Sequence, residues 1–248
     1  MLNVSTTALD AAFAAAQTHH RAGRLPEAEQ AYRAVLAGNA AHRGALWGLV
    51  HLAIHAGRPQ QAVDLLLRIT ALEPENPDIW IELGKASAAT GNLIGACDAY
   101  RRAIAIAPAH VQAHVNYAHA LLLQGRLAES LAAHEHAIAL APANPAPIAA
   151  LGYVHQAAGR MDDAVAAFRR AAALAPTWPT PHSNLLFALH FLPETRPDDL
   201  FAEHRRWDDL HGSPRRKERR PHENERDPAR RLRVGYVSPD FRRHAVAT

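Results

Sequence analysis

Histidine is the residue type in this 248-residue sequence best suited to metal binding or proton transfer, and seventeen histidines are present. His51 and His55 are four residues apart, as are His110 and His114. On a helix this spacing places two imidazoles on one face, as a two-ligand zinc site requires. No carboxylate or cysteine completes an HExxH or CxxC motif beside either pair. We therefore interpret the histidines as surface and interface groups and expect neither a metal nor another cofactor.

Cys97 is the single cysteine, so the chain cannot form an internal disulfide. It follows Ala96 in an alanine-rich stretch, which is typical of a small buried residue and not of a nucleophile. The first ten residues lack the basic end and apolar run of a signal peptide, and no apolar run reaches the roughly 18 residues of a membrane helix. We expect a soluble cytoplasmic protein with no membrane partner.

Two basic stretches, RRKERR at 215–220 and RRLR at 230–233, could attract nucleic acid or anionic lipid. Residues 201–248 carry 13 basic and 8 acidic side chains, whereas residues 1–200 carry 14 and 16. Between residues 212 and 230, acidic residues interleave with the basic ones, and aromatic residues for base stacking are absent. We interpret 212–230 as a solvated basic linker and do not expect nucleic-acid binding.

Glycine and proline recur with a common period that defines the elements carrying Cys97 and most of the histidines. Glycines lie 34 residues apart at Gly23, Gly57, Gly91, Gly125 and Gly159, and prolines keep the same period at Pro74, Pro108, Pro142 and Pro176. Glycine supplies the left-handed backbone that ends a helix, and proline cannot continue one. The spacing predicts a repeated unit of helix, glycine turn, helix and proline turn, and therefore an all-α fold.

The unit resembles the tetratricopeptide repeat, most closely between residues 77 and 110. The signature positions of that range are Trp80, Leu83, Gly84, Ala96, Tyr100, Ala103 and Pro108, and those of 145–178 are Leu151, Gly152, Ala164, Phe168, Ala171 and Pro176. The pattern departs from the family at Ala40, His114, Ser130 and His134. The resemblance implies a right-handed superhelix, an α-solenoid, in residues 1–190. Its units are 9–42, 43–76, 77–110, 111–144 and 145–178, followed by a capping helix over 179–190.

Stacked repeats curve into a trough lined by the first helix of each unit, and such a wall binds extended peptides or partner helices. The register places nine side chains on this concave face: Trp47, His51, Glu82, Lys85, Asn116, His119, Tyr153, Gln156 and Asn184. Asn116 and Asn184 occupy the same position two units apart, and an amide side chain can both donate to and accept from a peptide backbone. The alternative is that both are ordinary solvated helix residues.

After the repeats, RPDDLFAEHRRWDDLHG predicts an amphipathic junction helix over 197–211. Asp198 and Asp199 suit its positive N-terminal end, and Gly212 is expected to end it. Residues 231–248 change pattern: Leu232, Val234, Tyr236 and Val237 form a β-favouring run that ends at SPD. This run indicates the first strand and loop of a further domain.

The segment RLRVGYVSPDFRRH is similar to the opening of the catalytic region in the O-linked N-acetylglucosamine transferase family (glycosyltransferase family 41), which includes bacterial SPINDLY-like proteins. SNLLFALHF and DDLFAEHRRWDDLH resemble the junction in that family. The resemblance implies a stub of a Rossmann-like glycosyltransferase domain and inverting transfer of N-acetylglucosamine from UDP-GlcNAc to serine or threonine. His244 matches the first histidine of the family's active-site loop, whereas Thr248 stands where a second one is expected.

We predict a protein–protein interaction scaffold that is the substrate-recognition repeat region of such a transferase. Almost the whole catalytic domain would lie beyond residue 248, so the chain alone would be a truncated product without turnover. UDP-GlcNAc would then bind only where the full domain is present. Two alternatives stay open: an active enzyme, and a stand-alone tetratricopeptide adaptor with no link to glycosylation.

Overall fold

The computed structural model of the protein describes residues 6–216, and every regular element in this range is helical. The first ten helices are α1 (Thr6–Arg21), α2 (Leu25–Gly38), α3 (Arg43–His55), α4 (Pro59–Leu72), α5 (Pro77–Ala89), α6 (Leu93–Ile106), α7 (Val111–Leu123), α8 (Leu127–Leu140), α9 (Pro145–Ala157) and α10 (Met161–Leu174). They are followed by α11 (Pro179–Leu189), α12 (Pro197–Trp207), the π-helix η1 (Asp208–Gly212) and α13 (Ser213–Arg216).

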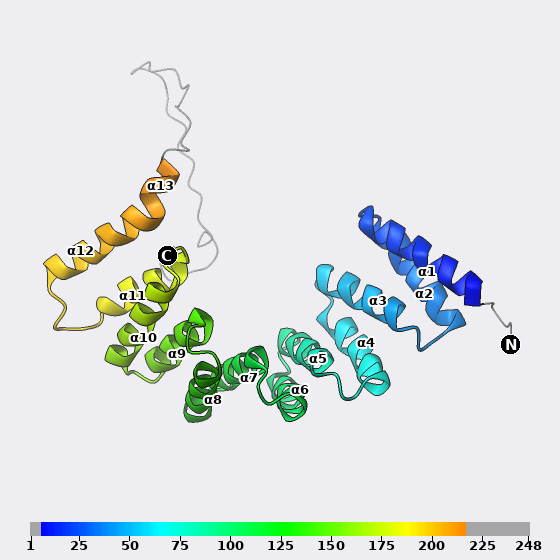
Figure 1. Cartoon of the computed structure of the whole chain (residues 1–248), viewed down its shortest axis with the longest axis horizontal. Coiled ribbons are helices and arrows are strands. Elements are labelled where there is room, and N and C mark those ends of the chain that lie inside the picture. Colours follow the sequence, from blue (N-terminus) through cyan, green and yellow to red (C-terminus); the bar gives the residue numbers. More distant parts are fainter. Residues whose placement is uncertain (1–5, 217–248) are drawn as a thin grey trace, which may run out of the picture.

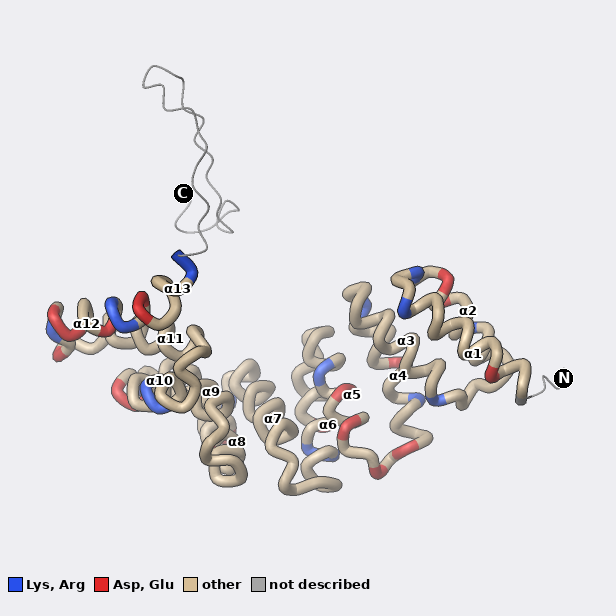
Figure 2. Tube along the Cα trace, turned by 45° about the horizontal axis from the view of Figure 1, so that its top comes forward, with Lys and Arg blue, Asp and Glu red and all other residues tan. Residues whose placement is uncertain are grey.

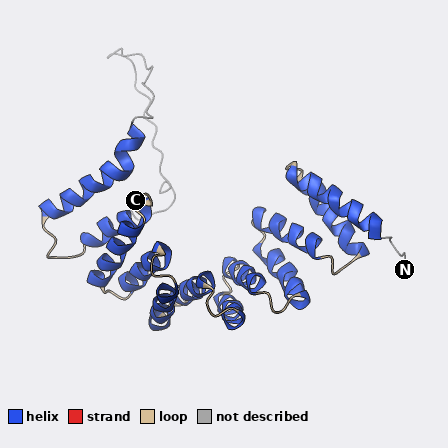
Figure 3. Ribbon diagram, in the orientation of Figure 1, coloured by secondary structure: helices blue, strands red, loops and turns tan. Residues whose placement is uncertain are grey.

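Helices α1 to α10 form five hairpins that stack side by side into a curved array (Figure 1). The odd-numbered helices lie along the inner side of the arch and the even-numbered helices along its outer side. Each 34-residue range predicted from the glycine spacing holds two helices, except that α1 begins before residue 9. The predicted all-α solenoid is confirmed in helices α1 to α11, and no strand occurs among residues 6–216 (Figure 3).

The periodic glycines end the first helix of each hairpin with a left-handed residue. Their φ angles run from 65° at Gly57 to 82° at Gly91. At Gly91 the next amide, that of Asn92, donates to the Ser87 carbonyl at 3.0 Å and closes the helix end. A Cβ added at Gly91 would meet no heavy atom within 4 Å. The position therefore requires glycine for its backbone angle and not for space.

A second kind of glycine lies inside the inner helices and makes room for an aromatic ring. A Cβ at Gly84 would lie 2.4 Å from a ring atom of Tyr100, and one at Gly152 would lie 2.5 Å from the Phe168 ring. Both rings are buried and fill the space between paired helices. Alanines at the helix crossing, such as Ala96, are fully buried and let the two backbones approach.

The C-terminal end of the array is covered by α11, whose Leu185 and Ala188 are buried against Ala164 and Phe168 of the fifth hairpin. The second helices of hairpins two to five begin sixteen residues after the first helices. By contrast, α12 begins eighteen residues after α11 and contains no buried residue. The chain therefore leaves the repeat register after α11.

The prediction that Gly212 ends the junction helix is wrong. The α-helical part stops at Trp207, a π-helical turn carries the chain through Gly212, and α13 continues to Arg216. Gly212 is not among the glycines with positive φ in the described chain, and Ser213 has helical angles (φ −58°, ψ −40°). The Asp208 carboxylate pairs with the Arg216 guanidinium and accepts from the Ser213 hydroxyl at 3.3 Å. These side-chain contacts hold the continued helix together.

Several predictions fall on residues outside 6–216. They concern most of the basic linker 212–230, the strand and loop of 231–248, and His244.

Candidate peptide-binding wall

The nine side chains predicted for the concave face all come from the inner row of helices. Trp47 and His51 lie on α3, Glu82 and Lys85 on α5, Asn116 and His119 on α7, Tyr153 and Gln156 on α9, and Asn184 on α11. None of the nine is buried. Their helices face the interior of the arch in Figure 1.

The structure pairs some of these nine residues with each other or with a neighbour on the same helix, and it does not gather them in one cluster. Lys85 Nζ donates to Glu82 Oε1 at 2.7 Å on α5. Asn184 Nδ2 donates to Tyr153 Oη at 2.5 Å and links the fifth hairpin to α11. Asn116 Oδ1 accepts from the neighbouring Gln112 amide at 2.8 Å. Each asparagine therefore uses only part of its capacity for hydrogen bonds.

Sequence reasoning missed a set of exposed apolar side chains on the inner helices and directly after α11. Ile54, Leu123, Phe187 and Phe191 are each 51–55% exposed, and the two phenylalanine rings lie 4.9 Å apart. Phe187 follows Tyr153 by 34 residues, so the repeat period alone could have placed it on the wall. The wall is thus more apolar than the nine predicted residues suggest.

Charge divides the wall into two parts. Helices α7, α9 and α11 contain no Lys, Arg, Asp or Glu, whereas α5 carries Asp78, Glu82 and Lys85 (Figure 2). A partner that lies along the second half of the arch therefore meets uncharged apolar, amide and hydroxyl groups and imidazoles on these helices.

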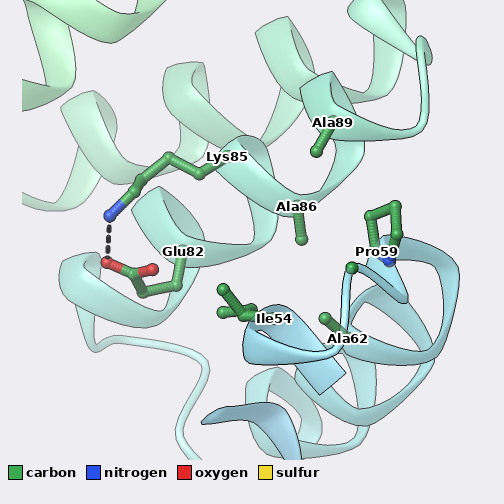
Figure 4. Close-up of a pocket in the computed structure, with 8 residues that line it drawn as sticks. Ile54, Pro59, Ala62, Glu82, Lys85, Ala86 and Ala89 are labelled. Carbon is green, nitrogen blue, oxygen red and sulfur yellow. Dashed lines mark hydrogen bonds and ion pairs between the residues drawn. The ribbon is translucent and has the colours of Figure 1, made fainter. Parts of the chain in front are cut away.

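A pocket of about 400 Å³ opens where the second hairpin meets α5 (Figure 4). Ala62 and Ala86 are buried, while Glu82 and Lys85 form an ion pair at one edge. The full set of lining residues is Ile54, Gly57, Pro59, Ala62, Glu82, Lys85, Ala86 and Ala89. The pocket accepts an apolar group of moderate size beside two charged groups.

Family models described as tetratricopeptide repeat match residues 19–86, 77–110, 96–145 and 148–179. Together these ranges run from the end of α1 to the start of α11, and the range 77–110 matches the third hairpin, α5 and α6. The chain is a tetratricopeptide-repeat protein. No curated protein sequence matches it.

Solved structures share the arrangement of this tetratricopeptide array at low sequence identity. MamA is 21% identical with a TM-score of 0.63, over 68% of this chain and 92% of MamA. TTC0263, a thermophilic TPR protein of Thermus thermophilus, is 21% identical with a TM-score of 0.55, over 74% of this chain and 100% of TTC0263. YrrB, described as a TPR protein with an unusual peptide-binding site, is 18% identical with a TM-score of 0.60, over 71% of this chain and 89% of YrrB. At these identities the likeness establishes the fold.

The histidines that the sequence pattern paired as possible metal ligands include three with structural partners. His110 caps α7 by accepting from the Ala113 amide at 3.3 Å, and the Nε2 of His114 hydrogen-bonds the Pro108 carbonyl at 2.7 Å. His51 lies beside Trp47, with ring centroids 5.9 Å apart. Within residues 6–216, no three His, Cys, Asp or Glu side chains group closely enough to hold a metal ion.

Cys97 is buried in the third repeat of this protein, and burial raises the pKa of its thiol. The Gln124 amide lies 3.1 Å from its sulfur and opposes this shift only in part. A thiol with a raised pKa carries little thiolate near neutral pH and is a poor nucleophile.

Among the described helices, none has the length and apolarity needed to cross a bilayer.

Proposed function

We propose that this tetratricopeptide array is a protein-interaction scaffold that binds extended polypeptide along its inner wall. The main support is that α7, α9 and α11 combine an absence of charged residues with exposed Leu123, Tyr153 and Phe187. Protein interfaces are depleted of charge and enriched in aromatic residues at their centre, whereas solvated helix faces are usually charged.

Amide groups would supply hydrogen bonds to the backbone of the partner. Asn116 and Asn184 lie at equivalent positions, and the bond from Asn184 to Tyr153 holds one of these amides in place. Backbone groups recur along any polypeptide, so such contacts favour an extended chain with little regard to its sequence. YrrB, whose description names a peptide-binding site, has the same fold.

Peptide display tests the proposal. Random dodecapeptides are selected on the full chain, and the affinity of the selected peptides is measured by fluorescence anisotropy for three variants. Phe187→Ser removes an exposed aromatic from the inner wall, and Asn116→Ala with Asn184→Ala removes both amides. Ile94→Ser removes a 71% exposed apolar side chain from outer helix α6 and serves as the matched control.

We expect the inner-wall variants to weaken binding by about tenfold, the order of a strong interface residue, and the control to change it by less than about twofold. Equal effects of Phe187→Ser and Ile94→Ser would remove the inner wall as the binding surface. Unfolding curves for each variant separate loss of contact from loss of fold.

At a finer level, we infer that the scaffold is the substrate-recognition region of an O-linked N-acetylglucosamine transferase of the cytoplasm. The support is the segment RLRVGYVSPDFRRH and its resemblance to the start of that family's catalytic region. The division would be repeats in 1–190, a junction helix in 197–211, a linker in 212–230 and the start of the catalytic domain in 231–248. His244 is the candidate catalytic residue by this resemblance, and UDP-GlcNAc would be the donor of the longer product.

The reading frame after codon 248 tests this finer proposal. A frame that continues into a glycosyltransferase region should yield a product that transfers N-acetylglucosamine from UDP-GlcNAc to protein acceptors. Phe187→Ser should then lower transfer to long acceptors and spare short peptides, and His244→Ala should lower both. A stop codon at this point would favour the stand-alone adaptor, which keeps the scaffold function.

A further inference from the structure

The pocket between the second and third repeats is lined by the end of α3, the turn after it, the start of α4 and the inner helix α5 (Figure 4). Ala62, fully buried, and Ala86, 6% exposed, are the most deeply buried of its lining side chains. Ile54 forms one wall and is half exposed. An apolar hollow of this kind is stabilised by covering its surface from water.

At this junction a proline stands where the other repeats carry a long apolar side chain. The second helix of each repeat begins at Leu25, Leu93, Leu127 and Met161 in repeats one, three, four and five, and all four side chains are at least half buried. In repeat two the same position is Pro59, whose short ring lines the pocket.

The facing helix does not compensate for this loss. At this junction α5 presents Ala86 and Ala89. The two equivalent positions hold at least one larger side chain at every other junction: Leu52 and His55, Ala120 and Leu123, Val154 and Ala157, and Ala188 and Phe191. Three small residues from two repeats, Pro59, Ala86 and Ala89, thus line the pocket at positions where the other junctions carry a leucine or methionine and at least one further larger side chain.

We propose that this pocket binds one leucine or methionine side chain of a partner polypeptide whose backbone is extended. The choice of leucine or methionine follows from the array, which carries one of these two residues at the position of Pro59 in each of its other repeats. This inference rests on the proposed function of the inner wall and adds an anchoring position to it.

The polar edge of the pocket matches the backbone around such an anchor. Glu82 supplies a carboxylate acceptor and Lys85 an ammonium with three donors, of which its bond to Glu82 uses one. A peptide residue offers one backbone N–H and one C=O. Glu82 and Lys85 already neutralise each other, so the anchor needs no charged neighbour.

The test uses capped single residues as probes. N-acetyl-leucine N-methylamide and N-acetyl-methionine N-methylamide carry the anchor with one backbone unit on each side, and N-acetyl-alanine N-methylamide lacks it. Each is titrated into the full chain with methyl-labelled Ile and Ala, and the Ile54 and Ala86 signals are followed by NMR. We expect saturable shifts, with the Leu and Met probes binding roughly tenfold tighter than the Ala probe.

Variants that fill the pocket complete the test. Pro59→Leu installs the residue type of the other repeats, and Ala89→Leu fills the same volume from an exposed position should the first variant fail to fold. Either should abolish the shifts, whereas Met161→Leu at the equivalent position of repeat five should leave them unchanged. Equal affinity for the Leu and Ala probes, or shifts that persist in both filled variants, would overturn the proposal.

The display-selected peptides separate this inference from the scaffold function. If they carry a Leu or Met whose replacement by Ala weakens binding to the natural chain but not to Pro59→Leu, the anchor is established. If they bind Pro59→Leu unchanged yet lose affinity with Phe187→Ser, the wall binds peptides and the anchor is refuted. If neither Pro59→Leu nor Phe187→Ser changes the affinity of the selected peptides, both the scaffold function of the inner wall and the anchor are refuted.

Discussion

At the residue scale, the fourth repeat differs from the others at two buried positions of α8, where polar side chains replace apolar ones. Ser130 stands where the other repeats have alanine, and its hydroxyl donates to the Ala118 carbonyl at 2.7 Å. His134 stands where they have Tyr, Leu or Phe, and its Nδ1 donates to the Ser130 carbonyl at 2.9 Å. Its buried Nε2 has no hydrogen-bond partner within the described residues. Burial lowers the pKa of His134, so the native state keeps it neutral.

Acid should therefore destabilise the fourth repeat. Below about pH 6.5 the unfolded chain binds more protons at this histidine than the folded chain does, so the free energy of unfolding falls as pH drops through that value. Urea unfolding at pH 7.5 and 5.5 measures the loss. His134→Leu should add about 1–2 kcal/mol at pH 7 by removing an unsatisfied buried group, and should flatten the pH dependence. His51→Leu, at an exposed site, is the control; an equally steep profile in His134→Leu would contradict the account.

Two glycines of the third repeat should respond to alanine for different reasons. Gly91→Ala forces a side chain into a left-handed conformation and should cost about 1 kcal/mol. Gly84→Ala drives a methyl group into the Tyr100 ring and should cost about 1–3 kcal/mol. Adding Tyr100→Leu should reduce the cost of Gly84→Ala and leave that of Gly91→Ala unchanged, as a double-mutant cycle by urea unfolding measures. Identical coupling at both glycines would contradict this division.

At the element scale, α12 is held to α11 mainly by polar contacts. His182 Nε2 hydrogen-bonds Glu203 Oε1 at 2.8 Å, and Trp207 Nε1 donates to Ser183 Oγ at 3.0 Å. His182 is buried and its pKa is lowered by that burial, which Glu203 opposes. Elements with few buried apolar contacts open at a lower free energy than the rest of a fold.

Removing the Glu203 contact should release α12 while leaving the repeats intact. In Glu203→Ala, trypsin should cleave after the exposed Arg205 and Arg206 at least several-fold faster than in the natural chain, because cleavage requires local opening. The thermal unfolding of the repeats by circular dichroism should not move. Asp209→Ala, an exposed acidic residue on η1, is the control and should leave the cleavage rate unchanged.

The sequence predicted the repeated elements well because each is marked by local chemistry. The periodic glycines require positive φ at fixed intervals, and aromatic residues such as Tyr100 pair with a glycine on the partner helix. The end of the junction helix was missed because the Asp208 pair with Arg216 carries the helix through Gly212. The pocket at Pro59 was missed because it arises from small residues on two repeats, each unremarkable by itself.

At the scale of the whole molecule, the hairpins contact mainly their neighbours, and the core is a series of clusters along the arch and not one centre. Stability is then approximately a sum of terms between adjacent repeats. The curvature and the inner row of helices could be anticipated from the repeat pattern. The charge-free second half of the wall could also have been read from the absence of Lys, Arg, Asp and Glu in α7, α9 and α11.

Truncation should reveal this dependence on neighbours. A chain ending at residue 178 lacks α11 and exposes Ala164 and Phe168, which α11 covers. Its free energy of unfolding should fall by about 2–4 kcal/mol, the order of one buried aromatic side chain and its contacts. The first urea transition should therefore move to a lower urea concentration. A chain ending at residue 196 keeps α11 and should unfold like the natural protein. Equal unfolding of all three chains would show that α11 does not cap the array.

The junctions of this array repeat one arrangement, and the first residue of the second helix varies among them: it is Leu in repeats one, three and four, Met in repeat five and Pro in repeat two. A single codon change from proline to leucine at residue 59 would erase a receptor for a side chain without altering the backbone path, and the reverse change would create one at a junction whose facing helix also carries small residues. A repeat protein of this kind can therefore diversify its recognition one junction at a time, while its architecture stays constant.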